Sequence, residues 1–96
     1  MESKMKKYME GIIEIGTSDL GIQKLRNVIE ILSPFVKSRE DMLFGYLIGS
    51  IRSALIGYTD KFYSRYPSSA ENDALWKMLL AQIEEIRSKI TREFGR

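Results

Sequence analysis

The sequence predicts an all-α protein: a single domain over residues 1–96, folded as a four-helix, antiparallel up-down bundle with a long helical hairpin, and assembled as a dimer. Apolar residues recur every three or four positions through four successive segments, as in amphipathic helices, and no strand pattern is found. Capping residues, glycines and two prolines separate these segments. A chain of 96 residues suits one domain with one modest core.

The first two predicted helices cover about residues 3–15 and 18–33. Gly16 predicts the end of the first helix, and Ser18 can cap the second, where Asp19 suits the positive end of the helix dipole. Pro34 ends or kinks the second helix, because proline lacks an amide proton and clashes with the preceding turn. The apolar stripes are Met5, Tyr8, Met9, Ile12 and Ile15 in the first helix, and Leu25, Val28, Ile29 and Leu32 in the second.

The third and fourth predicted helices cover about residues 38–66 and 68–94 and should form the antiparallel hairpin, since a short link joins them. The Ser38 hydroxyl can cap the amide of Asp41, and Pro67 ends the third helix. Ser68 and Glu71 have the spacing of a capping box. The apolar stripe of the fourth helix is Leu75, Leu79, Ile83, Ile86 and Ile90.

Composition argues against catalysis. The chain has no cysteine and no histidine, which removes disulfides, thiolate metal sites and the commonest general base and metal ligand. No glycine-rich loop joins a strand to a helix, so no phosphate cradle is expected. Glu10 and Glu14 lie one turn apart, but a solvated helix face has the same pattern as a magnesium or calcium site. We therefore expect no enzymatic activity, no cofactor and no metal.

Charge and hydropathy predict a cytoplasmic protein that does not enter a membrane. The net charge of +2 is too small to imply nucleic acid or membrane by itself, and no secretory leader pattern is seen at the start of the sequence. Residues 42–58 are an apolar stretch with a small-xxx-small motif, at the short end of the roughly 17–25 residues that span a bilayer. Arg52 lies near its middle, and inserting an arginine at the centre of a bilayer costs about 2.5–3.5 kcal/mol.

The third predicted helix is apolar nearly all round. One side, predicted to face the core, carries Phe44, Leu47, Ile51, Leu55, Tyr58 and Phe62. The opposite side carries the small-residue stripe, which we define as Gly45, Gly49, Ser53 and Gly57. Three glycines inside a helix cost roughly 3 kcal/mol in helix propensity. This cost predicts another backbone packed closely along the stripe.

The predicted partner of the stripe is a second copy of the chain. Residues four apart follow the ridge that suits a crossing angle of roughly −40° to −50°, whereas neighbours in an up-down bundle cross nearer to 20°. Arg52 can pair with Asp60 of the second chain, extend to water or contact an acidic partner. Two alternatives stay open: the helix over residues 3–15 covers the stripe, or the stripe lines a ligand groove. The predicted interface is Gly45, Gly49, Arg52, Ser53, Ile56 and Gly57.

Aromatic residues gather in the sequence around the hairpin near Pro67. They can close one end of the core, or they can form a small pocket or partner site, because tyrosine and tryptophan are enriched at interfaces. The candidate pocket is Phe62, Tyr63, Tyr66 and Trp76.

Basic residues suggest a second functional class. In an alternating bundle, the start of the first helix and the ends of the second and fourth share one pole, and cations there can contact phosphates or an acidic protein. The candidate anion-binding residues are Lys6, Lys7, Arg39, Arg87 and Arg92. The sequence thus predicts a self-associating interaction or scaffolding protein with an unidentified protein partner. The alternatives are a nucleic-acid-associated accessory protein and, less favoured, a small-molecule-binding bundle.

Overall fold

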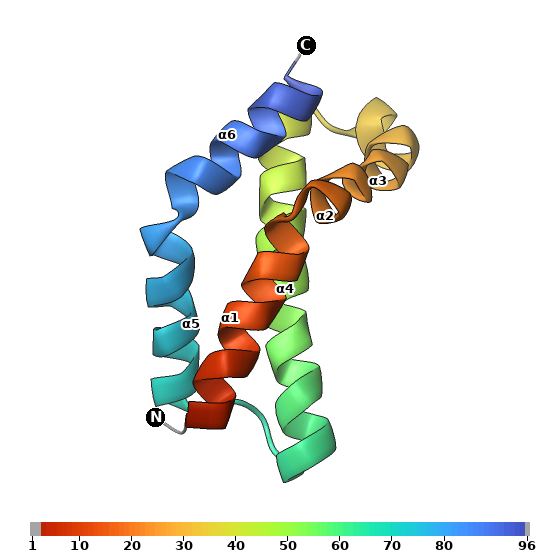
Figure 1. The fold of residues 1–96 in the computed structure, drawn as a ribbon. Helices are drawn as coiled ribbons and strands as arrows, with labels where there is room; N and C mark the ends of the chain where they lie inside the picture. The colour runs from red at the N-terminus through yellow and green to blue at the C-terminus, as the bar shows by residue number, and fades with distance from the viewer. Residues whose placement is uncertain (1–2, 96) are drawn as a thin grey trace.

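The computed structural model describes residues 3–95, which form helices joined by short links, with no strand in that range (Figure 1). This confirms the all-α prediction. The long helix α4 is the axis of the molecule, and a short 3₁₀ turn, η1, precedes it. The elements are α1 (Ser3–Thr17), α2 (Asp19–Gln23), α3 (Leu25–Leu32), η1 (Ser33–Phe35), α4 (Arg39–Tyr63), α5 (Ser69–Ala81) and α6 (Ile83–Phe94).

The helices pack around one side of α4 in an elongated molecule of 41 × 23 × 21 Å. In Figure 1, α1 runs beside α4 in the opposite direction, and α6 crosses the first turns of α4. α5 packs against α1, while direct contact between α4 and α5 is sparse along the described residues. α2 and α3 lie across one end of the molecule. The second predicted helix therefore does not run alongside α4 and α5, as the fourth helix of a bundle would.

The second predicted helix is divided at Lys24 into α2 and α3, and Gly21 in α2 packs closely against the end of α1. Ser18 caps α2 as expected, because its hydroxyl accepts a hydrogen bond from the amide of Gly21 at 3.1 Å. A Cβ atom on Gly21 would lie 2.4 Å from the carbonyl oxygen of Gly16, so only glycine allows α2 to approach the end of α1 this closely. α2 ends after five residues, and α3 continues in its own direction to the 3₁₀ turn that contains Pro34.

The link between α4 and α5 contains the predicted capping box, but α4 ends at Tyr63, before the predicted end at Tyr66. Ser64 ends α4 in the left-handed conformation, with φ of 53°. Ser68 and Glu71 form a full capping box at the start of α5. Glu71 is buried and also pairs with Arg65 at 2.7 Å. This hydrogen-bonded guanidinium, more than any other contact, lowers the pKa of the Glu71 carboxyl to about 2.

The fourth predicted helix is interrupted at Gln82, where the backbone (φ −118°, ψ 8°) leaves the helical region. α6 bends from there toward the first turns of α4 (Figure 1). The predicted stripe nevertheless stays on the inner side: its members are buried, except Ile83, which is half-buried. The bend brings Phe94 into the core, which the sequence pattern did not predict.

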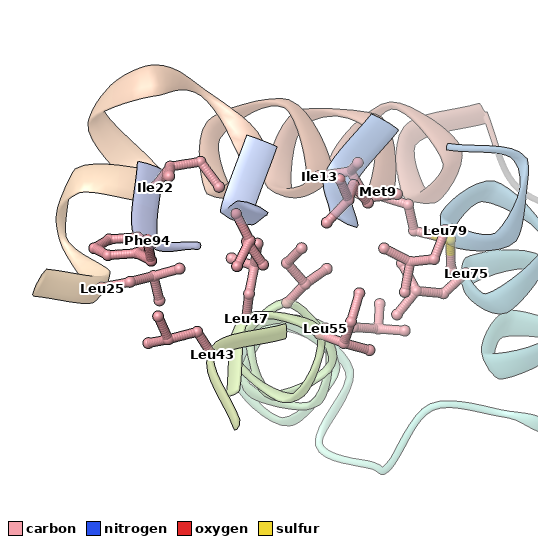
Figure 2. Packing of buried hydrophobic residues seen from close by; sticks show 14 of the residues in the cluster. Met9, Ile13, Ile22, Leu25, Leu43, Leu47, Leu55, Leu75, Leu79 and Phe94 are labelled. Carbon is pink, nitrogen blue, oxygen red and sulfur yellow. The ribbon is translucent and has the colours of Figure 1, made fainter. Parts of the chain in front are cut away.

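One continuous hydrophobic core joins the helices (Figure 2). In α1 its buried positions are four apart, so Ile13 is buried and Ile15 is 72% exposed, contrary to the predicted stripe. In α4 the prediction is wrong at the end of the helix, where Thr59 is buried and Phe62 is exposed. The fully buried apolar side chains include Met5, Met9, Leu43, Leu55, Leu75, Leu79, Ile86 and Ile90.

Candidate self-association surface

No residue between 3 and 95 covers the small-residue stripe. Gly45, Gly49, Ser53 and Gly57 are all exposed. A Cβ atom built on any of the three glycines would meet nothing within 4 Å. The alternative in which α1 covers the stripe is therefore wrong, because α1 packs on the other side of α4, where a Cβ on Gly16 would lie 3.1 Å from Ile51 Cγ1.

An apolar groove opens where α4 and α5 stand apart. It has a volume of about 470 Å³ and no charged residue in its lining. Trp76 and Leu80 stand beside it with 41% and 61% of their surface exposed. Large apolar side chains and bare glycine backbone thus occur together on one face, which we call the groove surface. It consists of Phe44, Gly45, Ile48 and Gly49 from α4, and Trp76, Leu80 and Ile83 from α5 and α6.

The remaining predicted interface residues continue the outer side of α4. Ile56 is half-buried and Arg52 is exposed. Neither Arg52 nor Asp60 has an ion-pair partner within the described part of the chain. Their charges are therefore available to a molecule that docks on this side.

The predicted aromatic pocket is not assembled as one unit. Tyr58 stacks on Tyr8 with ring centroids 3.8 Å apart, and its ring lies 4.9 Å from Phe62 and 6.0 Å from Tyr63. Burial raises the pKa of the Tyr8 hydroxyl, which donates to the carbonyl oxygen of Ala54 at 3.0 Å. These rings join α1 to α4 and so have a structural role.

Trp76 and Tyr66, the other two predicted members of the aromatic pocket, lie elsewhere. Trp76 lines the apolar groove beside Gly49, more than three helical turns along α4 from Phe62. Tyr66 is 79% exposed in the link that follows α4. The spacing in sequence placed Trp76 near the hairpin, but two helical turns of α5 carry it away from the loop.

The predicted basic pole is divided between the two ends of the molecule. Lys6 and Lys7 lie near the start of α1, whereas Arg39, at the start of α4, and Arg92, on α6, lie toward the opposite end (Figure 1). Arg39 donates to the carbonyl oxygen of Phe94 at 3.2 Å. Arg87 donates to Asp41 and thereby lowers the pKa of that carboxyl. Arg39 and Arg87 thus hold α6 against the start of α4.

A second apolar hollow was not predicted. It has a volume of about 320 Å³ and lies where the end of α1, α2 and α3 meet α4. Ile15, Leu20 and Tyr46 line it and remain largely exposed. The apolar spacing of the first predicted helix placed Ile15 in the core, so the sequence gave no signal for this hollow.

No group of three or more acidic side chains in residues 3–95 is placed to hold a metal ion. Within the same described range, no helix has the length and apolar character needed to cross a bilayer. Comparisons with protein-family models, with curated proteins and with solved structures give no match. The groove surface and the small-residue stripe are the exposed apolar features of α4.

Proposed function

We propose that this protein is a non-enzymatic helical interaction module that works by self-association through the groove surface and the small-residue stripe. The observation that carries the proposal is the pairing of bare glycine backbone with exposed Trp76 and Leu80 on one face. An apolar patch of this kind marks interaction sites in soluble proteins. Interface centres favour aromatic residues and few charges, and the uncharged lining with Trp76 beside it has this composition.

The glycines support the same proposal because they lower the stability of α4. Each interior glycine lowers helix stability by about 1 kcal/mol relative to alanine, and no contact among the described residues requires Gly45, Gly49 or Gly57. An approaching second helix would make use of the missing side chains, because small residues let backbones come close. Nucleic-acid binding is less well supported, since the basic residues that suggested it lie at two ends of the molecule.

Light scattering on the full chain at tens of micromolar tests the proposal. We expect twice the chain mass of 11.1 kDa, because the apolar groove surface is covered only in the assembly. A monomer at every concentration up to the millimolar range would overturn it. A 96-residue chain is small enough for the two masses to be resolved cleanly.

The substitution Gly49→Leu locates the interface. A leucine there fills the space that the second copy needs, and the block occurs twice in a symmetric dimer, so we expect the mass to fall toward that of a monomer. Gly11→Leu is the matched control, because Gly11 is also inside a helix and a Cβ there also meets nothing within 4 Å. Both variants should keep their helical circular dichroism. If Gly49→Leu has the same mass as the wild type, the interface does not include Gly49.

A further inference from the structure

The two sides of the apolar groove carry residues with matched spacing. On α4, Gly45, Gly49 and Arg52 follow one another at steps of four and three. Such steps keep residues on one side of a helix, so Arg52 continues the side of α4 that lines the groove. On α5, read backwards, the same steps of four and three lead from Leu80 to Trp76 and then to Asp73.

The two series run in opposite directions along the groove, because α4 and α5 are antiparallel (Figure 1). Gly45 and Gly49 line the groove from α4, and Leu80 and Trp76 line it from α5. One further step along each helix, away from α6, leads to Arg52 on α4 and to Asp73 on α5. Small residues on α4 and large ones on α5 thus share one groove, and beyond them the two helices carry charges of opposite sign.

This complementarity is not used within the chain. The space above Gly45 and Gly49 is open, and Trp76 and Leu80 remain exposed. Among the residues that the structure describes, neither Arg52 nor Asp73 has an ion-pair partner. A second copy facing the first would present the large residues and Asp73 of its own α5 to the small residues and Arg52 of α4.

We infer that two copies associate face to face, so that α4 packs antiparallel against α5 of the other copy and Arg52 pairs with the partner's Asp73. The inference rests on the proposed function and adds the orientation of the dimer. A two-fold axis parallel to α4 satisfies both copies at once, because Trp76 and Leu80 of each enter the space above the other's glycines. α4 and α5 of both copies then form a four-helix assembly.

The exposed apolar side chains favour this arrangement over one in which α4 packs on the partner's α4. In that alternative, Arg52 would pair with the partner's Asp60, and the small-residue stripes would face each other. Trp76 and Leu80 lie on α5 and would remain largely exposed beside such a contact. The arrangement on α5 covers both large apolar side chains and matches Arg52 with an opposite charge.

Charge reversal tests the inference. Arg52→Asp and Asp73→Arg each turn two attractive pairs of the dimer into repulsive ones, so each variant alone should have a dissociation constant raised about tenfold at low salt. An equimolar mixture of the two variants restores both attractive pairs, and we expect a heterodimer of near wild-type affinity. Analytical ultracentrifugation with one variant fluorescently labelled measures all three constants. The differences should shrink at 0.5 M salt because the charges are screened.

Asp60→Arg is the matched control for orientation. It should change the dissociation constant little and should not restore dimerisation when mixed with Arg52→Asp. Restoration by Asp60→Arg instead of Asp73→Arg would overturn the inference in favour of contact between the two α4 helices. A stable wild-type dimer that none of the three reversals affects would also overturn it while leaving the proposed function standing. A wild-type monomer would refute the proposed function itself.

Discussion

At the scale of single residues, the Glu71 carboxylate stands out for the hydrogen bonds that it accepts from both sides of the link between α4 and α5. It closes the capping box of α5 by accepting from the amide of Ser68 at 2.8 Å, and it accepts two hydrogen bonds from the guanidinium of Arg65, at 2.7 and 3.0 Å. The guanidinium of Arg65 also lies 5.2 Å from the ring centroid of Tyr63. One buried carboxylate thereby ties the end of α4 to the start of α5.

The depressed pKa of Glu71 predicts a pH-dependent stability. The folded pKa is about 2, whereas an unfolded glutamate titrates near ~4.3, so the unfolded chain binds the proton more readily. The stabilisation is complete above about pH 5 and is lost as the pH falls toward 2. Glu71→Gln keeps an acceptor for the capping box but removes the charge. We expect it to lower the melting temperature at pH 7 and to have little effect at pH 2; an equal effect at both values would contradict this role.

At the scale of the elements, the glycines fall into two groups with opposite structural consequences. Gly21 is required within the chain, because a Cβ there would lie 2.4 Å from the Gly16 carbonyl oxygen, and a Cβ on Gly16 would press on the Ile51 side chain at 3.1 Å. Gly45 and Gly49 have open space above them. Sequence position does not separate the groups, since all four lie inside helices. Their difference arises from which helix surface lies opposite each one.

Gly21→Ala should therefore weaken the corner between α1 and α2. The added methyl group would lie 2.4 Å from a backbone oxygen that cannot move without moving the helix, and overpacking of this kind costs about 1–3 kcal/mol. Gly11→Ala is the control, and there we expect a gain of up to about 1 kcal/mol, because the site is open and alanine has the better helix propensity. Urea denaturation followed by circular dichroism measures both. Equal effects would show that the close approach at Gly21 carries no cost.

At the scale of the whole molecule, the distribution of apolar surface is uneven. The core is continuous, yet Trp76 and Leu80 beside the groove and Ile15 and Leu20 beside the second hollow stay exposed. The cause is the course of α2 and α3, which cross one end of the molecule and leave the sides of α4 open (Figure 1). Self-association through the groove surface would cover Trp76 and Leu80 without a further segment of chain.

The single tryptophan of the sequence reports on that cover. Trp76 is 41% exposed beside the groove, so dimerisation through the groove surface should remove it from water. We expect its fluorescence emission to shift to longer wavelength when the protein is diluted below the dissociation constant, in parallel with the fall in mass. Gly49→Leu should show the monomer spectrum at all concentrations. A change in mass without a change in emission would place the interface away from Trp76.

Several features of this protein follow from the sequence alone because they depend on neighbouring residues. Ser38 and Ser68 cap their helices as predicted, and the link around Pro67 reverses the chain. The stripe of α5 and α6 is predicted almost in full, since residues three and four apart share a side whatever the helix packs against.

Only the tertiary structure decides what lies opposite each side of a helix. It places Gly21 against Gly16, sends α2 and α3 across one end, and leaves the stripe at Gly49 open. It also sets Trp76 beside Gly49 rather than beside Phe62. These outcomes depend on how whole helices are placed against one another, through contacts between residues far apart in the chain. Local sequence patterns determine the composition of each helix face, but they do not determine its neighbour.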